Sequence, residues 1–201
     1  MKRKIGIYGG TFSPPHLGHI HAAKAFLEAE KLDKLMIIPT CIPPHKIKKD
    51  NATDIDRLAM CRLAFSFLDA IEVSDMEMKR GGKSYTSDTL SALKSEKNEL
   101  YFLCGSDMFL TLPDWHEPKT VFSLATIVCL TREKSKEVWA SLEKAKEAYI
   151  REYQAKIHLL TIEAKEVSSS EIRQRCQNGE QYSDLVPSSV ADYIEEKRLY
   201  R

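Results

Sequence analysis

The chain has 201 residues, enough for one domain of ordinary size with a substantial hydrophobic core. Its 30 lysines and arginines nearly balance 29 aspartates and glutamates, so there is no global positive field to hold long nucleic acid or an anionic membrane. No apolar stretch approaches the ~20 residues that span a bilayer, and no apolar signal core follows the charged first residues, so we expect a cytoplasmic protein.

Short apolar runs alternate with helical patterns along the chain. The first run, residues 5–8, ends at two glycines and predicts a buried strand, and residues 17–30 then repeat apolar residues at helical spacing. Another short run, residues 35–38, completes a predicted βαβ unit. The later segments, in order, predict helix 54–68, strand 71–73, helix 86–97, strand 100–104, strand 127–130 and a charged outer helix 133–152.

This alternation favours an α/β fold. We expect a single domain over residues 1–201, built as a doubly wound (Rossmann-like) parallel sheet with helices on both faces. Such sheets bind ligands beyond the carboxyl ends of their strands. Segments 9–10, 39–46 and 105–107 each follow a predicted strand. We therefore expect these loops to converge on one edge of the sheet.

The cysteines and histidines do not suggest a metal site. No Cys-x-x-Cys pair is present, and we expect reduced, mostly buried thiols at Cys41, Cys61, Cys104, Cys129 and Cys176. Three histidines lie close together at positions 16, 19 and 21, but the sequence gives them no acidic or thiolate companion. We therefore predict no metal ligands among the protein side chains.

The segment GGTFSPPHLGH, residues 9–19, combines a glycine turn, a proline pair at a predicted helix start and two histidines. At a spacing of three, His16 and His19 lie on one helix face, and in a first turn they join free backbone N–H groups at the positive end of the helix dipole. That arrangement is suited to bind phosphate. The alternative is an ordinary strand-to-helix turn with surface histidines. Neither a Walker loop nor a Gly-x-Gly-x-x-Gly fingerprint is present.

A second signal lies at VSSSEIR, residues 167–173. Ser168 and Glu171 have the spacing of a capping box, and we expect Arg173 in the first helical turn. Alone, this segment predicts no more than a good helix start. A guanidinium at this place would nevertheless suit phosphate oxygens, because its planar donors match them and it stays charged.

Together these segments resemble the nucleotidyltransferase superfamily, with its His-x-Gly-His and Ile-Ser-Ser-Thr-x-Ile-Arg motifs. Three further segments resemble loops of the bacterial nicotinate-mononucleotide adenylyltransferases: IPPHK at 42–46, SYT at 84–86 with DTL at 88–90, and GSD at 105–107 with LPDW at 112–115. The resemblance covers residues 5–173. It implies transfer of the adenylyl group of ATP to nicotinate mononucleotide, giving deamido-NAD and pyrophosphate without a covalent enzyme intermediate.

The resemblance also implies roles for individual residues. Catalytic roles fall on His16, His19 and Arg173. ATP binding falls on Gly9, Gly10, Thr11, Phe12, Gly105, Asp107, Ser169, Ser170 and Arg173. Mononucleotide binding falls on His45, Lys46, Tyr85, Thr86 and Trp115, the first two at its phosphate and Thr86 and Trp115 at its pyridine ring. Each segment also has a structural alternative: a solvated proline loop at 45–46, a core tryptophan at 115 and a helix cap at Asp107.

Magnesium is the expected cofactor, bound through ATP phosphates and water rather than through protein side chains. The implied partners are ATP and nicotinate mononucleotide, with no nucleic acid and no membrane, and the sequence leaves a homo-oligomer open. Ser13 departs from the family, which commonly has aspartate there. A serine can still bond to the backbone, more weakly and without charge, which puts local loop rigidity and a link to magnesium in question.

Two other functions remain open. A sister enzyme acting on phosphopantetheine or another mononucleotide would share both phosphate motifs, and only the three loops at 42–46, 84–90 and 105–115 favour the pyridine nucleotide. A non-catalytic nucleotide-binding regulator would keep the pocket without turnover. The presence of His16, His19 and Arg173 together argues against that regulator.

Overall fold

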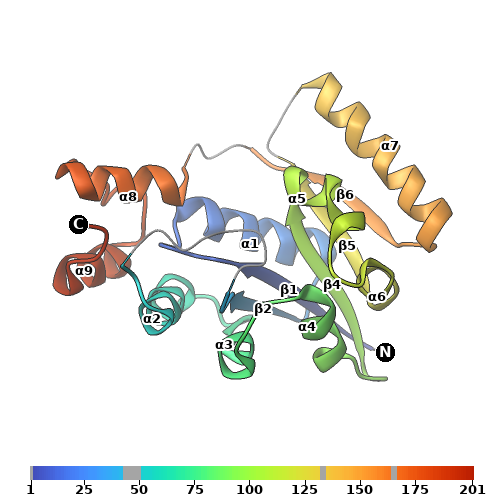
Figure 1. Cartoon of the computed structure of the whole chain (residues 1–201), viewed down its shortest axis with the longest axis horizontal. Coiled ribbons are helices and arrows are strands. Elements are labelled where there is room, and N and C mark those ends of the chain that lie inside the picture. The colour runs from blue at the N-terminus through green and yellow to red at the C-terminus, as the bar shows by residue number, and fades with distance from the viewer. Residues whose placement is uncertain (1, 43–50, 132–134, 164–166) are drawn as a thin grey trace. The chain divides into compact units, whose positions relative to one another are not determined.

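The computed structural model describes residues 2–42, 51–131, 135–163 and 167–201. The strands are β1 (Arg3–Gly10), β2 (Lys34–Pro39), β3 (Ile71–Val73), β4 (Asn98–Gly105), β5 (Ala125–Thr131) and β6 (Ile157–Thr161). The α-helices are α1 (Leu17–Glu30), α2 (Asp54–Phe65), α3 (Met76–Arg80), α4 (Thr86–Leu93), α5 (Ser106–Leu110), α6 (Pro118–Leu124), α7 (Lys136–Tyr153), α8 (Ser169–Asn178) and α9 (Ser188–Lys197), and η1 (Leu112–Asp114) is a 3₁₀ turn (Figure 1).

The strands form one sheet in the order β3-β2-β1-β4-β5-β6. The pairs β1–β4, β4–β5 and β5–β6 are parallel, with Ile7 opposite Phe102 and Phe102 opposite Ile127. This is the strand order of a doubly wound Rossmann-like sheet, so the predicted α/β class is confirmed. The order reverses between β1 and β4, and ligands bind beyond the carboxyl ends of the strands at such a reversal.

The chain divides into two compact units. The first unit comprises Met1–Tyr8, Ala25–Leu35 and Tyr85–Ala164, and the second comprises Gly9–Lys24, Met36–Ser84 and Lys165–Arg201. Helix α1 and strands β1 and β2 each contribute residues to both units. The expectation of a single nucleotidyltransferase domain over 1–201 stays a prediction.

The first unit packs its helices on apolar strands. Gly6 of β1 lies where helix residues approach closely, since a Cβ there would come within 2.9 Å of the Phe26 ring. Tyr149 of α7 is buried and donates its hydroxyl to the Phe109 carbonyl at 3.0 Å. Burial raises the pKa of Tyr149 to about 12, so the hydroxyl keeps its proton.

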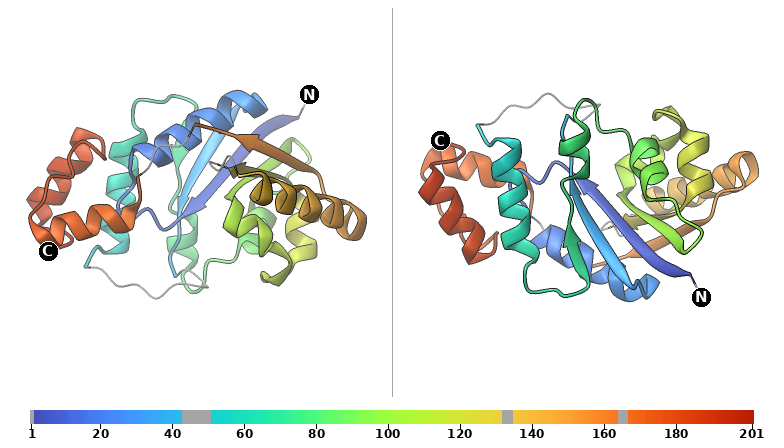
Figure 2. Two further views of the ribbon diagram at one scale, coloured as in Figure 1. Left: turned by 90° about the horizontal axis from the view of Figure 1, so that it is seen from above. Right: turned by 90° about the horizontal axis from the view of Figure 1, so that it is seen from below.

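The second unit packs helix α2 against helix α9, which lie side by side in Figures 1 and 2. The buried face of α2 includes Met60 and Ala64, and α9 buries Val190 and Ile194. A capping box begins α2: the Thr53 side chain accepts from the Asp56 backbone, and the Asp56 carboxylate accepts from the Thr53 backbone. These apolar contacts and the cap anchor α2 beside the loops that follow β1 and β2.

Most element predictions are confirmed, with shifted ends. Helix 17–30 and strand 71–73 have the predicted bounds, whereas the helix predicted over 86–97 ends at Leu93. Sequence reasoning missed α3, α5, α6, β6 and α9. Apart from strand β6, these missed elements are helices of at most ten residues, in which the apolar period repeats too few times to stand out. Within the described residues, no helix is long and apolar enough to cross a membrane.

Candidate nucleotide-binding site

The loop over residues 9–16, named the phosphate loop here, leaves the end of β1 in the second unit. Its start is tied to β2, because the Thr40 backbone N–H donates to the Gly10 carbonyl at 2.9 Å. Phe12 has a left-handed backbone (φ 48°) and is 2% exposed. A Cβ at Gly10 would meet the Phe12 ring at 3.0 Å, which explains the glycine at this position. The buried ring and the strand contact together fix the course of the loop.

His16 directly precedes α1, rather than lying in its first turn as predicted. Its carbonyl accepts the backbone N–H groups of His19 and Ile20, at 2.9 and 3.3 Å, so it starts the helix. The His16 and His19 rings are stacked, with centroids 3.7 Å apart. The His19 ring also meets the edge of Phe12 at 4.9 Å. The structure therefore brings the two predicted catalytic histidines together, and His16 is only 3% exposed.

One hydrogen bond determines which nitrogen of His19 carries a proton. The His16 backbone N–H donates to His19 Nδ1 at 3.2 Å. A ring nitrogen that accepts a hydrogen bond has no proton there, so this contact places the ring N–H of His19 on Nε2. His19 thus offers an Nε2–H donor, the group needed to bind a phosphate oxygen.

The start of α8 also reaches the phosphate loop, and both belong to the second unit. Ser168 caps α8 by accepting from the Glu171 backbone, as predicted. Arg173 Nη1 donates to the Ser13 carbonyl at 2.7 Å, and Ser169 Oγ donates to the Pro14 carbonyl at 2.9 Å. The prediction that Arg173 lies in the first turn is wrong by one position, because α8 begins at Ser169 and Arg173 is its fifth residue. That position directs the guanidinium back over the turn toward the loop.

Ser170 lies beside that guanidinium. The second nitrogen of the group, Arg173 Nη2, donates to Ser170 Oγ at 3.1 Å. Ser170 is exposed, whereas Ser169 is half-buried and Arg173 is partly exposed. Three predicted phosphate-binding side chains, those of Ser169, Ser170 and Arg173, therefore gather at one end of α8, next to Ser13 and Pro14.

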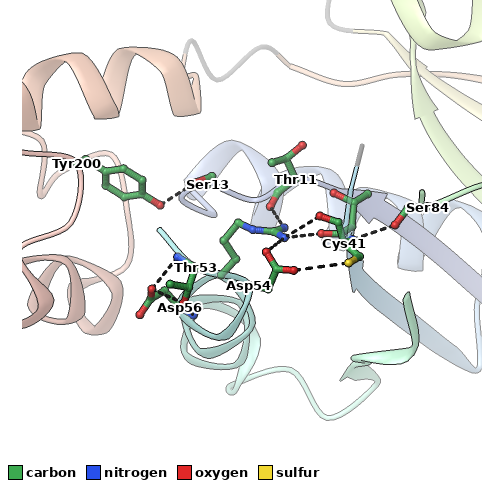
Figure 3. Close-up of polar contacts among 10 residues, drawn as sticks. Thr11, Ser13, Cys41, Thr53, Asp54, Asp56, Ser84 and Tyr200 are labelled. Carbon is green, nitrogen blue, oxygen red and sulfur yellow. Dashed lines mark hydrogen bonds and ion pairs between the residues drawn. The ribbon is translucent and has the colours of Figure 1, made fainter. Parts of the chain in front are cut away.

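Arg57 of α2 is a buried cation that sequence reasoning missed. It is 1% exposed, and it donates to the Thr11 carbonyl at 2.8 Å and to the Thr40 carbonyl at 2.5 Å, with Asp54 Oδ1 at 2.9 Å balancing its charge. In Figure 3, dashed lines from Thr11 and from Asp54 end on the same guanidinium group. Arg57 therefore joins the loop after β1 to the residue after β2. A signal was available, because helical spacing puts Arg57 on the face of Met60 and Ala64.

Cys41, the second residue after β2, lies in the same network (Figure 3). Its backbone N–H donates to Ser84 Oγ at 2.9 Å, and its thiol donates to Asp54 Oδ2 at 3.6 Å. Burial, followed by the nearby Asp54 carboxylate, raises the pKa of Cys41, so the thiol stays protonated. The predicted phosphate ligands His45 and Lys46 lie outside the described residues.

In the first unit, β4 ends at Gly105 and α5 begins at once. Asp107 is exposed and is the second residue of α5, whereas the cap position is Gly105 and no side chain caps it. The helix-cap alternative for Asp107 is therefore excluded. A Cβ at Gly105 would lie 3.1 Å from Asp107 Oδ1, so glycine leaves room for this carboxylate.

The predicted pyridine-binding residues also belong to the first unit. Tyr85 precedes α4, Thr86 is its first residue, and the Tyr85 ring lies 4.1 Å from the His116 ring. Trp115 is half-buried, donates Nε1–H to Thr111 Oγ1 at 3.4 Å and meets the Phe102 ring edge-on at 6.1 Å. Trp115 is therefore only partly buried, against Phe102, and its stacking role stays a prediction.

The free cysteines agree with their prediction: Cys61, Cys104, Cys129 and Cys176 are buried and Cys41 is half-buried. Across residues 2–42, 51–131, 135–163 and 167–201, no group of three or more histidine, cysteine, aspartate or glutamate side chains could hold a metal ion.

Comparison with known proteins identifies the family. The sequence model described as "Cytidylyltransferase-like" matches residues 7–175. A protein named "Probable nicotinate-nucleotide adenylyltransferase" from Desulfatibacillum aliphaticivorans is 37% identical over 220 residues, covering 98% of this chain and 99% of that protein. A protein of the same name from Desulfitobacterium hafniense is 38% identical, covering 99% and 96%.

A solved structure, "Plasmodium falciparum nicotinic acid mononucleotide adenylyltransferase complexed with NaAD", shares the fold. Its TM-score is 0.76 at 19% identity, and the match covers 98% of this chain and 97% of that one. The family model spans both histidines and Arg173, and the relatives match along nearly the whole length. The chain therefore belongs to the cytidylyltransferase-like family, among the nicotinate-nucleotide adenylyltransferases.

Proposed function

We propose that this chain carries out the reaction of its family by direct in-line attack, without a covalent enzyme intermediate. Nicotinate mononucleotide and ATP give deamido-NAD and pyrophosphate. A phosphate oxygen of the mononucleotide attacks the α-phosphorus of ATP and pyrophosphate leaves on the opposite side. The protein must hold two anions in line and stabilise charge on the transferring group.

The stacked histidine pair carries this proposal. His19 is held through Nδ1 by the His16 backbone N–H, so its Nε2–H is a fixed donor. We assign this donor to an oxygen of the transferring phosphoryl group, where a pre-oriented donor stabilises charge without reorganisation. Arg173 supplies positive charge for the phosphates.

The remaining phosphate contacts come from the phosphate loop and α8. We assign the β and γ phosphates of ATP to Arg173 with Ser169 or Ser170, and the backbone of Gly9, Gly10, Thr11 and Phe12 to the nucleotide. Arg173 Nη2 and the Ser170 hydroxyl already lie 3.1 Å apart, so both can turn to one phosphate. His45 and Lys46 keep their predicted role at the mononucleotide phosphate.

In the first unit we assign Asp107 to the ribose hydroxyls of ATP, next to Gly105. Its exposed carboxylate is a suitable acceptor for two neighbouring hydroxyls. Thr86 and Trp115, with Tyr85 preceding α4, are assigned to the pyridine ring. The accessible indole offers a flat apolar surface, on which a heterocycle can stack.

Magnesium is the proposed cofactor and the cytoplasm the proposed compartment. Bound to the ATP phosphates, the ion would neutralise part of their charge. Arg173 and His19 would then orient the same phosphate chain from the protein side. The ion would need no cage of protein carboxylates.

The experiment is a pyrophosphate-release assay with ATP and nicotinate mononucleotide. We expect turnover, and deamido-NAD as the second product. Binding of ATP without turnover would support the nucleotide-binding regulator instead, and turnover only with phosphopantetheine would support the sister enzyme. Replacing nicotinate by nicotinamide mononucleotide in the same assay measures the preference for the carboxylate.

A further inference from the structure

The side chain of Ser13 is paired with a residue 187 positions away. Ser13 is 2% exposed, and its Oγ lies 3.0 Å from the hydroxyl oxygen of Tyr200, which is also 2% exposed. Both residues belong to the second unit, and Figure 3 shows the Tyr200 hydroxyl pointing at Ser13. Ser13 lies in the phosphate loop, three residues before His16.

Tyr200 is itself firmly placed. Its backbone N–H donates to Asn51 Oδ1 at 2.7 Å, and its hydroxyl contacts Met60 Sδ of α2 at 4.0 Å. Its backbone is left-handed (φ 63°), a conformation that costs a non-glycine residue about 1 kcal/mol or more and persists only when the surroundings hold it. The position of the hydroxyl is therefore determined by the fold, not by a loose tail.

Ser13 is held at two points. Its carbonyl accepts from Arg173, and its side chain meets Tyr200. The next carbonyl, at Pro14, accepts from Ser169. Two of these three contacts come from Arg173 and Ser169, which are assigned to ATP. The third comes from Tyr200, which has no assigned role. A displacement of Ser13 would shift both Arg173 and the start of α1, where His16 and His19 lie.

We propose that Tyr200 is a positioning residue for adenylyl transfer, acting through Ser13 on the phosphate loop without touching substrate. The inference rests on the proposed function, since its main readout is turnover. It also fits the neutral serine at this position, because in a buried pair of hydroxyls one donates to the oxygen of the other. A pair held in this way keeps the loop ordered before substrate binds.

The test compares the Tyr200→Phe variant with Tyr182→Phe. Tyr182 is a matched control, because its ring is also buried and its hydroxyl bonds elsewhere in the second unit, to Glu195 Oε1 at 2.6 Å. We expect Tyr200→Phe to lower kcat about fivefold to tenfold, with KM for both substrates changed less than twofold. We expect Tyr182→Phe to lower the free energy of unfolding about as much as Tyr200→Phe does, while kcat stays within twofold of wild type. Equal kcat values for the two variants would overturn the proposal.

A double-mutant cycle with Ser13→Ala tests whether Tyr200 acts through Ser13. We expect the Ser13→Ala, Tyr200→Phe double variant to have nearly the kcat of the worse single variant. Independent, multiplying losses would contradict the proposed route.

Amide hydrogen exchange of residues 11–16 separates this inference from the proposed function. If the wild-type chain shows no turnover, the proposed function fails, and faster exchange in Tyr200→Phe but not in Tyr182→Phe would still support the positioning role. Unchanged exchange would overturn it.

Discussion

The phosphate loop of the second unit and the predicted pyridine-binding segment of the first unit are organised differently. In the phosphate loop, side chains from α2 and α8 donate to backbone carbonyls of Thr11, Ser13 and Pro14. In the pyridine-binding segment, the Tyr85 ring packs on the His116 ring, the Trp115 ring meets Phe102 edge-on, and the indole donates one long hydrogen bond to Thr111.

This difference agrees with the ligand groups proposed for the two segments. In-line transfer between two phosphates tolerates little displacement, so a backbone fixed by charged and hydroxyl donors is useful there. A heterocycle binds by area and orientation on an aromatic face, which adjusts over a wider range. Substitutions in the phosphate loop should therefore lower turnover, and those in the pyridine-binding segment should weaken binding of the mononucleotide.

The largest expected effect on turnover is that of His19→Ala. Removing the Nε2–H donor should lower kcat by one or more orders of magnitude and leave the fold intact, because the lost interaction acts mainly in the transition state. The measurement is the pyrophosphate-release assay together with a thermal melt. His21→Gln, on the same helix and without an assigned role, is the control. Near-normal activity of His19→Ala would refute the assignment.

Arg57→Met tests whether the phosphate loop depends on the buried cation. It removes donors from the Thr11 and Thr40 carbonyls and leaves Asp54 without its partner cation, so we expect a loss of about 3 kcal/mol in the free energy of unfolding and a lower kcat. Urea denaturation measures the loss. Arg62→Met, at an exposed position of the same helix, should change stability by less than about 0.5 kcal/mol. Similar losses in both variants would show that Arg57 has no special role.

Trp115→Ala tests the pyridine-binding segment. Loss of a stacking surface should raise KM for nicotinate mononucleotide about tenfold or more while the KM for ATP changes little. Steady-state kinetics with each substrate varied in turn make the comparison. Trp139→Ala, at the exposed tryptophan of α7, is the matched control. Equal rises in both KM values would contradict the stacking role.

The smallest effect concerns the cap of α2. Burial alone would raise the pKa of Asp56, but hydrogen bonds from Thr53, then from Tyr193, lower it overall. A lowered folded-state pKa gives stability that is present above the unfolded value, about 3.9, and is lost as pH falls through the folded value. Asp56→Asn should therefore be less stable than wild type at neutral pH, and the gap should close below about pH 4. Urea titrations at pH 7 and pH 3 check this, and a gap of the same size at both would refute it.

Features set by residues close together in the sequence could be predicted, whereas contacts between residues far apart in the sequence could not. The helix of residues 17–30 and the strand of residues 71–73 could be located from short-range pattern, and the Ser168 cap of α8 from three-residue spacing. The bounds of α4 were overestimated at its end, and short elements such as α5 gave too few periods to detect. His16 and His19 could be paired because their spacing on one helix face is itself local.

By itself, the sequence determined the α/β alternation of the longer elements, the chemical character of the predicted phosphate-binding side chains and the resemblance that implies the reaction. Tertiary structure decided that Arg57 holds the Thr11 carbonyl across 46 residues and that Tyr200 meets Ser13 across 187. It also decided that the His16 backbone N–H meets Nδ1 of His19. Motifs follow local spacing, whereas a buried guanidinium or hydroxyl finds its partner only when packing removes water and brings distant backbone together.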